Sequence, residues 1–509
     1  MRTKVVFGFI GAVGLAVLGC GGGGASTVDA APATGGSSAS GGTGPGATGG
    51  ARGGTNGAGG SSGAAGSAGG AGTGATAGGG GIAGVAGGLG GTAGSGAASV
   101  GGAAGGRGGQ AGLTGFVTRQ GTQFIDGGKR HVVVGANFWQ GMSLGSTAAG
   151  GDRARLTREL DRLQLLGVNN IRMVASAEGP DTAPYRIVPS LMPMPGVYNE
   201  QVFQGLDVFL DELAKRGMRA VMVLNNYWEW SGGFGQYVSW SDGSKIPDRI
   251  PNSNLYSSFV SYVDRFYACA TCQTAYRAHI NTLVNRVNTV NGRTYRDDPA
   301  IFAWQLANEP RDYPANWIND TAMFIKSLDP NHMVTVGSEG SWGGDFTTTH
   351  QSQYVDYTTC HIWVEPWGKY SATDSSASNL QSATSFATTY LQNHDTMAKQ
   401  LGKPLVLEEF GLARDGWASG GKTDPASPTT NRDKYYKSLY TVVETSLAKS
   451  GNALAGDNFW AWGGEARPPS KWTGDPPHEP AGWFSVYDAD TSTTAIISTH
   501  GATIKADAR

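Results

Sequence analysis

The chain has 509 residues, and its 38 Lys plus Arg nearly balance its 40 Asp plus Glu, for a formal charge of -2 at pH 7. A chain without a basic surplus lacks the field that neutralises phosphates, so we expect no nucleic-acid partner. The 81 glycines exceed what an ordinary globular chain contains, which indicates that part of the sequence is compositionally biased.

Residues 1–20 have the pattern of an export signal. Two basic residues precede an apolar run over 5–18, which ends at Gly19 and Cys20. The run is shorter than the roughly 20 residues that cross a bilayer, which disfavours a transmembrane anchor. Segment 17–20 resembles a bacterial lipoprotein box, in which the cysteine is acylated. We therefore expect an exported envelope lipoprotein that contacts the membrane only through a lipid on Cys20; plain secretion is the alternative.

Residues 21–115 form a Gly/Ala/Ser/Thr-rich linker. They contain no Phe, Trp or Tyr and only Asp29, Arg52 and Arg107 as charges, so they cannot bury a core. Glycine shows no period of three, which excludes collagen. A flexible coil of this length has a root-mean-square span of about 50–60 Å. We expect a disordered tether that leads to a domain over 116–509.

Within 116–509, short β-branched runs alternate with amphipathic segments. Eight runs predict strands, at 131–137, 169–175, 219–224, 300–305, 333–337, 357–362, 404–408 and 458–462. Apolar residues three and four apart predict helices between them, at 153–166, 203–216, 256–287, 379–400 and 432–448. Eight strand–helix units in one domain predict an α/β fold of the (β/α)8 TIM-barrel type. An open sheet is disfavoured because no glycine-rich phosphate loop follows the first strand.

In such barrels the chemistry lies at the C-terminal ends of the strands. Carboxylates, amides and indoles dominate the residues there: Asn137, Trp139, Arg172, Asn225, Asn226, Trp228, Asn308, Glu309, Glu339, His361, Trp363, Glu408, Glu409, Trp460 and Trp462. Indole faces stack on the C–H surfaces of sugars, while amides and acids bind hydroxyls. This set of side chains therefore favours a polysaccharide ligand.

Two of these carboxylates suit glycoside hydrolysis. Glu309 ends the fourth predicted strand and Glu409 the seventh, which places them on opposite sides of one cleft. Retaining hydrolysis needs one acid that protonates the leaving oxygen and one carboxylate about 5–5.5 Å away that attacks the anomeric carbon. Because neighbours alternate along a strand, only one of Glu408 and Glu409 is expected to face the cleft, and the pattern does not tell which. The alternative is that each Glu only caps or pairs at the barrel rim.

Three cysteines remain after the leader. Cys269 and Cys272 have thioredoxin-like spacing but no surrounding βαβ domain, and exported proteins keep their disulfides. We expect a local structural disulfide between them, with free thiols or a redox or metal role as the alternatives. Cys360 lies in a predicted strand and is expected in the core.

The sequence around the two carboxylates resembles glycoside hydrolase family 5. The likeness rests on Asn-Glu-Pro at 308–310 and Glu-Phe-Gly at 409–411, on the fourth and seventh strands. Further segments are similar to the endo-β-1,4-mannanase branch of the family: 224–228, 232–240, 304–311, 334–340 and 458–464. The resemblance extends over 116–502.

The resemblance implies a role for each matching residue. It makes Glu309 the acid/base, Glu409 the nucleophile and Asn308 a contact of the sugar 2-hydroxyl. Arg172 would hold the nucleophile charged, since a nearby guanidinium lowers the pKa of a carboxylate. The other expected substrate-binding residues are His361 at the strand-six position, Trp460 as the stacking platform, and Trp363, Trp139, Asn226, Trp228 and Trp462.

The sequence departs from the family pattern at three positions. Trp363 stands where many relatives have a Tyr that bonds the nucleophile, so the indole N–H either supplies that bond or the bond is missing. Gln140 stands where an aromatic residue is common, and Ala466 replaces a frequent Gly. The Pro-rich segment 467–482 is expected to form a loop that shapes the cleft.

The sequence as a whole predicts a retaining endo-β-1,4-mannanase that acts as a monomer on β-mannan. Neither a cofactor nor a metal is expected, since the histidines are scattered and form no His-Glu-x-x-His pattern. The alternatives are the same chemistry on β-1,4-glucan or another hemicellulose, and a non-catalytic glycan-binding lipoprotein. Glu309→Gln and Glu409→Gln are expected to reduce turnover by several orders of magnitude, and Glu408→Gln to be much milder.

Overall fold

A computed structural model describes residues 113, 115–250, 252–340, 345–417 and 426–507. The predicted leader at 1–20, including Cys20, and almost all of the predicted linker lie outside the described residues. In the part of the chain that is described, no helix is long and apolar enough to cross a membrane.

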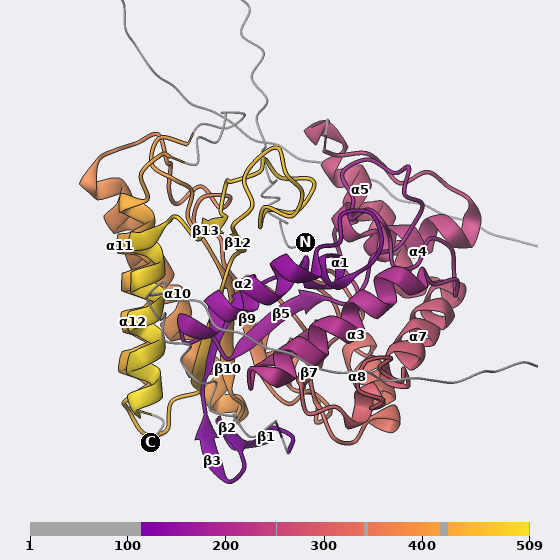
Figure 1. Ribbon diagram of the computed structural model, residues 1–509, viewed down its shortest axis with the longest axis horizontal. Helices are drawn as coiled ribbons and strands as arrows, with labels where there is room; N and C mark the ends of the chain where they lie inside the picture. The colour runs from indigo at the N-terminus through magenta and orange to yellow at the C-terminus, as the bar shows by residue number, and fades with distance from the viewer. Residues whose placement is uncertain (1–112, 114, 251, 341–344, 418–425, 508–509) are drawn as a thin grey trace, which may run out of the picture. The chain divides into compact units, whose positions relative to one another are not determined.

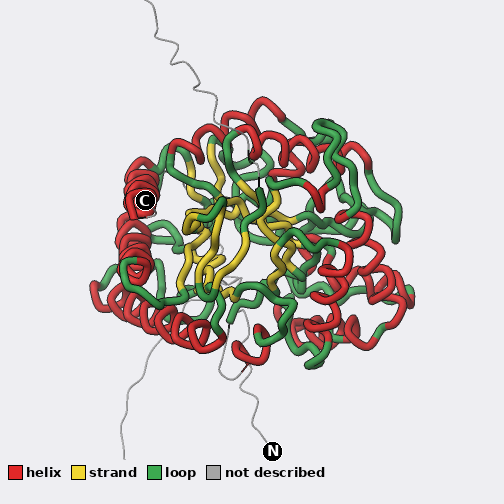
Figure 2. The backbone as a smooth tube through the Cα atoms, turned by 90° about the horizontal axis from the view of Figure 1, so that it is seen from below, coloured by secondary structure: helices red, strands yellow, loops and turns green. Residues whose placement is uncertain are grey.

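A parallel eight-stranded sheet forms the centre of this domain, with helices around it (Figure 2). Its strands follow one another around the ring in the order β8-β7-β6-β5-β4-β11-β10-β9. Their bounds are β4 Val133–Asn137, β5 Asn170–Val174, β6 Arg219–Val223, β7 Ile301–Gln305, β8 Met333–Thr335, β9 Thr358–Ile362, β10 Leu405–Phe410 and β11 Leu454–Phe459. Every residue of these strands is buried, as expected of parallel strands that are covered on both faces.

The ring closes between β8 and the residues that lead into β9. Asp356 N donates to Val334 O at 2.7 Å, and Thr335 Oγ1 donates to Tyr357 O at 2.9 Å. Farther along, His361 N donates to Glu339 O at 2.9 Å. The α/β TIM-barrel fold predicted from the sequence is therefore confirmed.

The helices cover the outside of the sheet (Figure 1). The longer ones are α2 Arg153–Leu165, α3 Glu200–Lys215, α4 Gly233–Asp242, α5 Tyr256–Val263, α7 Ala270–Val284, α8 Trp317–Leu328, α10 Ala377–Leu401, α11 Thr430–Leu447 and α12 Thr491–Asp507. The helix α2 shows why they form where they do. The Asp152 side chain caps its N-terminus by accepting from Arg155 N, and Leu156, Leu160 and Leu163 turn one face to the core.

Three strands before the barrel were not predicted. β1 Thr118–Gln120, β2 Gln123–Asp126 and β3 Lys129–His131 form an antiparallel sheet, seen at the bottom of Figure 1. Phe124 of this sheet packs edge-on against Phe302 and Tyr357, which belong to or adjoin barrel strands. The first predicted strand, 131–137, therefore corresponds to the last residue of β3 and the whole of β4.

Two predicted elements have different bounds in the structure. The last strand, predicted at 458–462, is β11 at Leu454–Phe459, followed by a separate short strand β12 Trp462–Gly464, which pairs with β13 Val486–Tyr487. Its first residues, Leu-Ala-Gly-Asp, lack the β-branched signal, and Gly456 has φ 142°. The helix predicted at 256–287 is three helices, α5, α6 (Arg265–Ala268) and α7.

A disulfide lies at one of these helix breaks, between α6 and α7. Cys269 has extended backbone, caps α7 and is bonded to Cys272, with a Cα–Cα distance of 5.2 Å. Cys272 also packs against α4, with Sγ 3.4 Å from Tyr237 O. Cys360 is buried and is not disulfide-bonded to another cysteine of the described residues.

We expect Cys269→Ser to lower the free energy of unfolding by about 2 kcal/mol, the loop-closure term for so short a loop. The value of kcat should not change, because the bond lies outside the site described below. Urea unfolding of the oxidised and reduced protein, with Cys272→Ser as the matched variant, measures this. An inactive but folded Cys269→Ser enzyme would contradict a purely structural role.

Candidate active site

The C-terminal ends of four barrel strands bring the predicted catalytic residues together. Glu309 follows β7, Glu409 lies in β10, Arg172 in β5 and His361 in β9, and all four are at least 95% buried. One oxygen of Glu309 and one of Glu409 lie within 4.8 Å of each other. This separation suits direct attack on the anomeric carbon, because an intervening water would need about 6.5–9.5 Å.

Arg172 holds Glu409 in place. Its Nη1 donates to Glu409 Oε1 and to Asn137 Oδ1, the latter at 3.0 Å, and its Nη2 donates to Asn308 Oδ1 at 2.7 Å. Burial raises the pKa of Glu409, while the charges of His361 and Arg172 oppose that rise. The guanidinium thus stabilises the ionised form that a nucleophile needs.

Glu309 lies between an indole and an imidazole. Trp228 Nε1 donates to its Oε2 at 2.6 Å, and His361 Nδ1 lies 2.8 Å from its Oε1. Burial disfavours its ionisation, but the bond and charge of His361 outweigh burial and lower the pKa of Glu309 to about 2. Its backbone has φ 48°, a left-handed conformation that residues other than glycine rarely adopt, and such strain concentrates at functional sites.

His361 Nδ1 contacts both catalytic carboxylates, Glu309 Oε1 at 2.8 Å and Glu409 Oε2 at 3.4 Å. Burial lowers its pKa, but the charge of Glu409 and the contacts with Glu309 and Glu408 outweigh burial and raise it to about 9. Glu309, His361 and Glu409 could also offer three ligand atoms to a metal within 4.8 Å of one another. A protonated imidazole has no lone pair to give, and Arg172 adds a second cation, so this donor set does not suit a divalent ion.

A β-bulge places two neighbouring carboxylates in the site. In the pairing of β10 with β9, Leu407 is opposite Cys360 and Glu409 is opposite His361, so Glu408 has no partner. Both acids contact Arg172. The Glu409 carboxylate binds its Nη1, and Glu408 Oε2 lies 3.5 Å from its Nε. The expectation that strict alternation turns only one of them inward is therefore wrong here.

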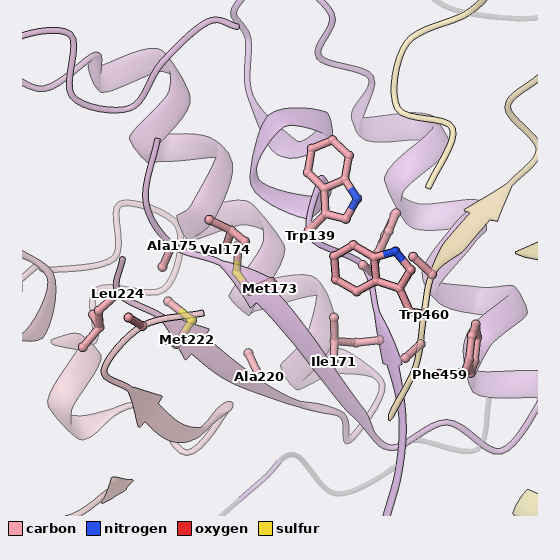
Figure 3. Close-up of a cluster of buried hydrophobic side chains, with 14 of the residues drawn as sticks. Trp139, Ile171, Met173, Val174, Ala175, Ala220, Met222, Leu224, Phe459 and Trp460 are labelled. Carbon is pink, nitrogen blue, oxygen red and sulfur yellow. The ribbon is translucent and has the colours of Figure 1, made fainter. Parts of the chain in front are cut away.

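Trp139, Trp363 and Trp460 lie among the apolar side chains of the barrel top (Figure 3 shows Trp139 and Trp460). Trp363 packs edge-on against Trp460 at 6.0 Å, and the Trp460 indole N–H has no hydrogen-bond partner among the described residues. Within the described part of the chain, Arg172 donates the hydrogen bond to the Glu409 carboxylate, and Trp363 donates none. The hydrogen bond that many relatives make from a Tyr to the nucleophile is therefore missing at Trp363.

Other predicted side chains are occupied by protein partners. Asn226 accepts from Trp228 N and Asn308 Nδ2, so it shapes the turn that presents Trp228. Trp462 is buried, and its N–H donates to Glu159 of α2 at 3.0 Å instead of turning to the carboxylates. Gln140 donates to Trp462 O at 2.8 Å and is a buried structural residue.

Sequence reasoning missed two guanidiniums beside Trp228. Arg249 and Arg311 each lie 4.7 Å from the centroid of the indole ring. Arg311 also donates to Glu339 Oε2 at 2.6 Å and lies 3.9 Å from Glu309 Oε2. Arg311 directly follows the Asn-Glu-Pro motif, a signal that could have identified it; Arg249 has no such signal.

Sequence reasoning anticipated a loop after β11 but not its contacts. In the 472–485 segment, Gly474 O accepts from Trp139 Nε1 at 2.6 Å, and the His478 ring stacks on Trp230 at 6.1 Å and 9°. Burial raises the pKa of Glu479 well above its usual range, and the charges of Asp475, Glu409 and Glu309 raise it further. The segment therefore contacts the residues that follow β4 and β6, and it brings a fourth acid, after Glu309, Glu408 and Glu409, toward the site.

We expect Trp228→Phe to reduce kcat/KM about tenfold, because it removes a hydrogen bond to a charged group while keeping an aromatic ring. The lost N–H stabilises ionised Glu309, so its removal raises the pKa of that carboxyl and moves the basic limb of the pH profile to higher pH. A pH series of kcat/KM on an aryl glycoside measures both effects. A basic limb that moves to lower pH would contradict this role for Trp228.

Comparison with known proteins places this constellation in a family. Residues 114–508 match a family model described as GH family 5 beta-mannosidase-like. A mannan endo-1,4-beta-mannosidase of Arabidopsis thaliana is 30% identical over 372 residues, 68% of this chain and 82% of the relative. The crystal structure of a glycoside hydrolase family 5 mannosidase from Rhizomucor miehei is 42% identical with a TM-score of 0.73, over 77% of this chain and 98% of that one. An endo-1,4-beta-mannanase from the same fungus, 23% identical with a TM-score of 0.56 over 77% of this chain and 99% of its own, shares the fold. The chain described here belongs to glycoside hydrolase family 5.

Proposed function

We propose that the protein hydrolyses β-1,4-mannosidic bonds with retention of configuration, through a covalent glycosyl-enzyme. The observation that carries this proposal is the pair of carboxylates within 4.8 Å, one bonded to a guanidinium and the other to an imidazole. Relatives named as mannosidases and mannanases support mannan-type substrates.

In the first step Glu409 attacks the anomeric carbon while Glu309 protonates the leaving oxygen. The proton lies on His361 Nδ1 in the free site and crosses the 2.8 Å contact to Glu309 Oε1 as the leaving oxygen draws it. In the second step the ionised Glu309 deprotonates a water that attacks the glycosyl-enzyme. The His361 contact and charge, which favour the ionised form of Glu309, keep this carboxylate able to accept the proton of the water.

The sequence predicts endo action on long mannan chains, and a second candidate is action at chain ends or on short β-mannooligosaccharides. The 472–485 segment favours the second. Its His478 Nδ1 and Glu479 Oε2 are buried atoms without a hydrogen-bond partner among the described residues, and the catalytic pair shapes the pKa of Glu479. Two buried polar atoms without partners, near the buried catalytic carboxylates, suit hydrogen bonds to the hydroxyls of a terminal sugar.

Product analysis separates the candidates. Digestion of linear mannan, galactomannan, mannopentaose and carboxymethyl cellulose would be followed by chromatography and viscometry. Early release of mannose with little loss of viscosity identifies chain-end action, whereas oligosaccharides with a rapid fall in viscosity identify endo action. Greater activity on cellulose would contradict a mannan substrate, and tight mannan binding without turnover would favour the glycan-binding alternative.

If the enzyme acts at chain ends, Glu479→Ala should reduce kcat/KM on mannotriose by up to about tenfold, the value of a hydrogen bond between neutral groups, because the raised pKa of Glu479 favours its neutral acid. The variant should lose little stability, because Glu479 Oε2 has no hydrogen-bond partner among the described residues and the contact of Oε1 with His478 Nε2 is long, 3.7 Å. Steady-state kinetics on mannotriose and on long mannan test this. Equal losses on both substrates would contradict a role in recognising chain ends.

We further propose that a lipid on Cys20 displays the enzyme on the cell envelope of a bacterium. The support is the sequence pattern of residues 1–20, and a flexible 21–115 would let the domain reach polysaccharide beyond the surface. Metabolic labelling with a fatty acid tests the lipid. Label in the wild-type chain that is lost in Cys20→Ser supports it, and release of unlabelled wild-type protein into the medium contradicts it.

A further inference from the structure

The mechanism above leaves one buried acid of the site without a role. The Glu408 side chain is completely buried, and its only hydrogen bond within the described residues comes from Gln305 Nε2 to Oε2, at 2.7 Å. Its Oε1 has no partner there. Burying a carboxylate costs free energy unless nearby cations compensate for it. A buried acid with a single hydrogen bond is therefore expected to interact with such cations.

We propose that Glu408 is a positioning residue of the reaction: it orients Arg172 against the nucleophile through Gln305 and holds His361 as an imidazolium. This inference rests on the proposed double-displacement function. Glu408 itself is assigned no contact with the sugar or with the attacking oxygen of Glu409.

Glu408 acts on Arg172 through the side-chain amide of Gln305. Because Gln305 Nε2 donates to Glu408, the amide must turn Oε1 the other way, where it accepts from Arg172 Nε at 2.9 Å. The backbone of Gly337 packs so closely that a Cβ there would lie 2.1 Å from Gln305 Nε2. The amide is therefore closely confined, and the charge of Glu408 selects which of its ends faces the guanidinium.

Glu408 also faces the His361 ring, on the side away from Glu309. Its Nδ1 faces Glu309 at 2.8 Å and Glu409 at 3.4 Å, and its Nε2 faces Glu408 Oε2 at 3.8 Å. No described residue accepts a hydrogen bond from Nε2, so the charge of Glu408 is what stabilises the proton on that side of the ring.

The other titratable groups near Glu408 are neutral. Burial and the Glu408 charge raise the pKa of the Tyr357 hydroxyl and of the Cys360 thiol well above their usual ranges. Among the described residues, the cations within 4.0 Å of Glu408 are therefore Arg172 and His361. Together these two cations face three carboxylates, Glu309, Glu408 and Glu409.

Removal of the Glu408 charge has a defined consequence. The Glu309–His361 pair holds the proton that the first step uses. As the pH rises, the pair loses this proton and kcat/KM falls, which is the basic limb of the pH profile. A negative charge beside the pair strengthens its hold on the proton. Without that charge the pair deprotonates at lower pH, and the basic limb moves to lower pH, opposite in direction to the shift expected for Trp228→Phe.

The test is Glu408→Gln in the full chain, with kcat/KM measured from pH 4 to pH 10 on aryl β-mannoside. We expect the basic limb to move down by roughly one pH unit and kcat to fall by about tenfold or less, far less than for the catalytic pair. Glu408→Asp keeps the charge and should leave the limb closer to that of the wild type. Glu444→Gln is the matched control, since Glu444 contacts the other buried histidine with a raised pKa, His500, outside the site.

A second readout does not depend on turnover. In ¹⁵N-histidine-labelled protein, with His361→Asn to assign the signal, the His361 imidazole should lose its proton at lower pH in Glu408→Gln than in the wild type. A folded Glu408→Gln enzyme with an unchanged basic limb and an unchanged His361 titration overturns the inference. Failure of both Glu408 variants to fold would assign the residue to stability and also overturn it.

These outcomes separate the inference from the proposed function. A wild-type enzyme that cleaves aryl β-glucoside but not β-mannoside contradicts the substrate, and the same pH profile on the glucoside still tests Glu408. A wild-type chain without any turnover contradicts the function, and the histidine titration still tests the charge effect.

Discussion

Glu409→Gln should reduce kcat by on the order of 10⁴-fold or more, even on an aryl β-mannoside with a good leaving group. Glutamine fills the same space and can still accept from Arg172, so the barrel should fold normally. It cannot attack the anomeric carbon, and without a nucleophile no glycosyl-enzyme forms. Burst and steady-state kinetics with dinitrophenyl β-mannoside measure the loss.

The smaller variant Glu409→Ala gives the control for this prediction. It leaves room for an external nucleophile, so azide should restore turnover and yield the α-mannosyl azide, the product of a single inversion. If Glu408→Gln were instead the inactivating change, and azide rescued Glu408→Ala, the assignment of the nucleophile would be wrong by one residue. The bulge at Glu408 makes this comparison necessary, because both acids contact Arg172.

Glu309→Gln should reduce turnover of mannan by about 10²- to 10⁴-fold, the usual contribution of a general acid and base. The loss should depend on the leaving group. Natural sugars need protonation and should react very slowly, whereas dinitrophenolate leaves without it, so the first step should survive on the activated substrate. The second step lacks its base, and the glycosyl-enzyme should accumulate.

Mass spectrometry of the trapped protein and azide rescue test this assignment. The intact protein should gain the mass of one mannosyl group on a peptide that contains Glu409. Azide should release the β-mannosyl azide, with retained configuration, because it needs no deprotonation. An equal loss on mannan and on the activated substrate, without an accumulated intermediate, would contradict the acid/base role of Glu309.

The strand order and the places of Glu309, Glu409, Arg172 and His361 were predictable because parallel strands are short buried runs and their C-terminal ends meet at one edge. The bulge at Glu408 was not predictable, since it arises from the offset between β10 and β9 and breaks the period of two on which the pattern relies. The same holds for β11, whose glycine and aspartate carry no strand signal.

The side-chain partners of the tryptophans were also beyond the sequence. Trp460 and Trp462 lie two residues apart, and only the fold shows that the Trp460 N–H is unpaired within the described residues while that of Trp462 binds Glu159. The 472–485 segment is held by contacts distant in sequence, such as the hydrogen bonds from Gly482 N and Phe484 N to Asp475 and the carbonyl of Gly474 on Trp139. The order of residues along the chain does not predict contacts between segments that are distant in sequence.

The central claim is that Glu309 and Glu409 cleave a β-mannosidic bond by two displacements. Time-resolved ¹H NMR of mannohexaose hydrolysis tests it most directly, because anomeric protons report the configuration of the sugar before mutarotation. The predicted result is that the β-anomer of the new reducing end appears first and the α-anomer follows by mutarotation. Initial formation of the α-anomer would show a single displacement and contradict the assigned roles of both carboxylates.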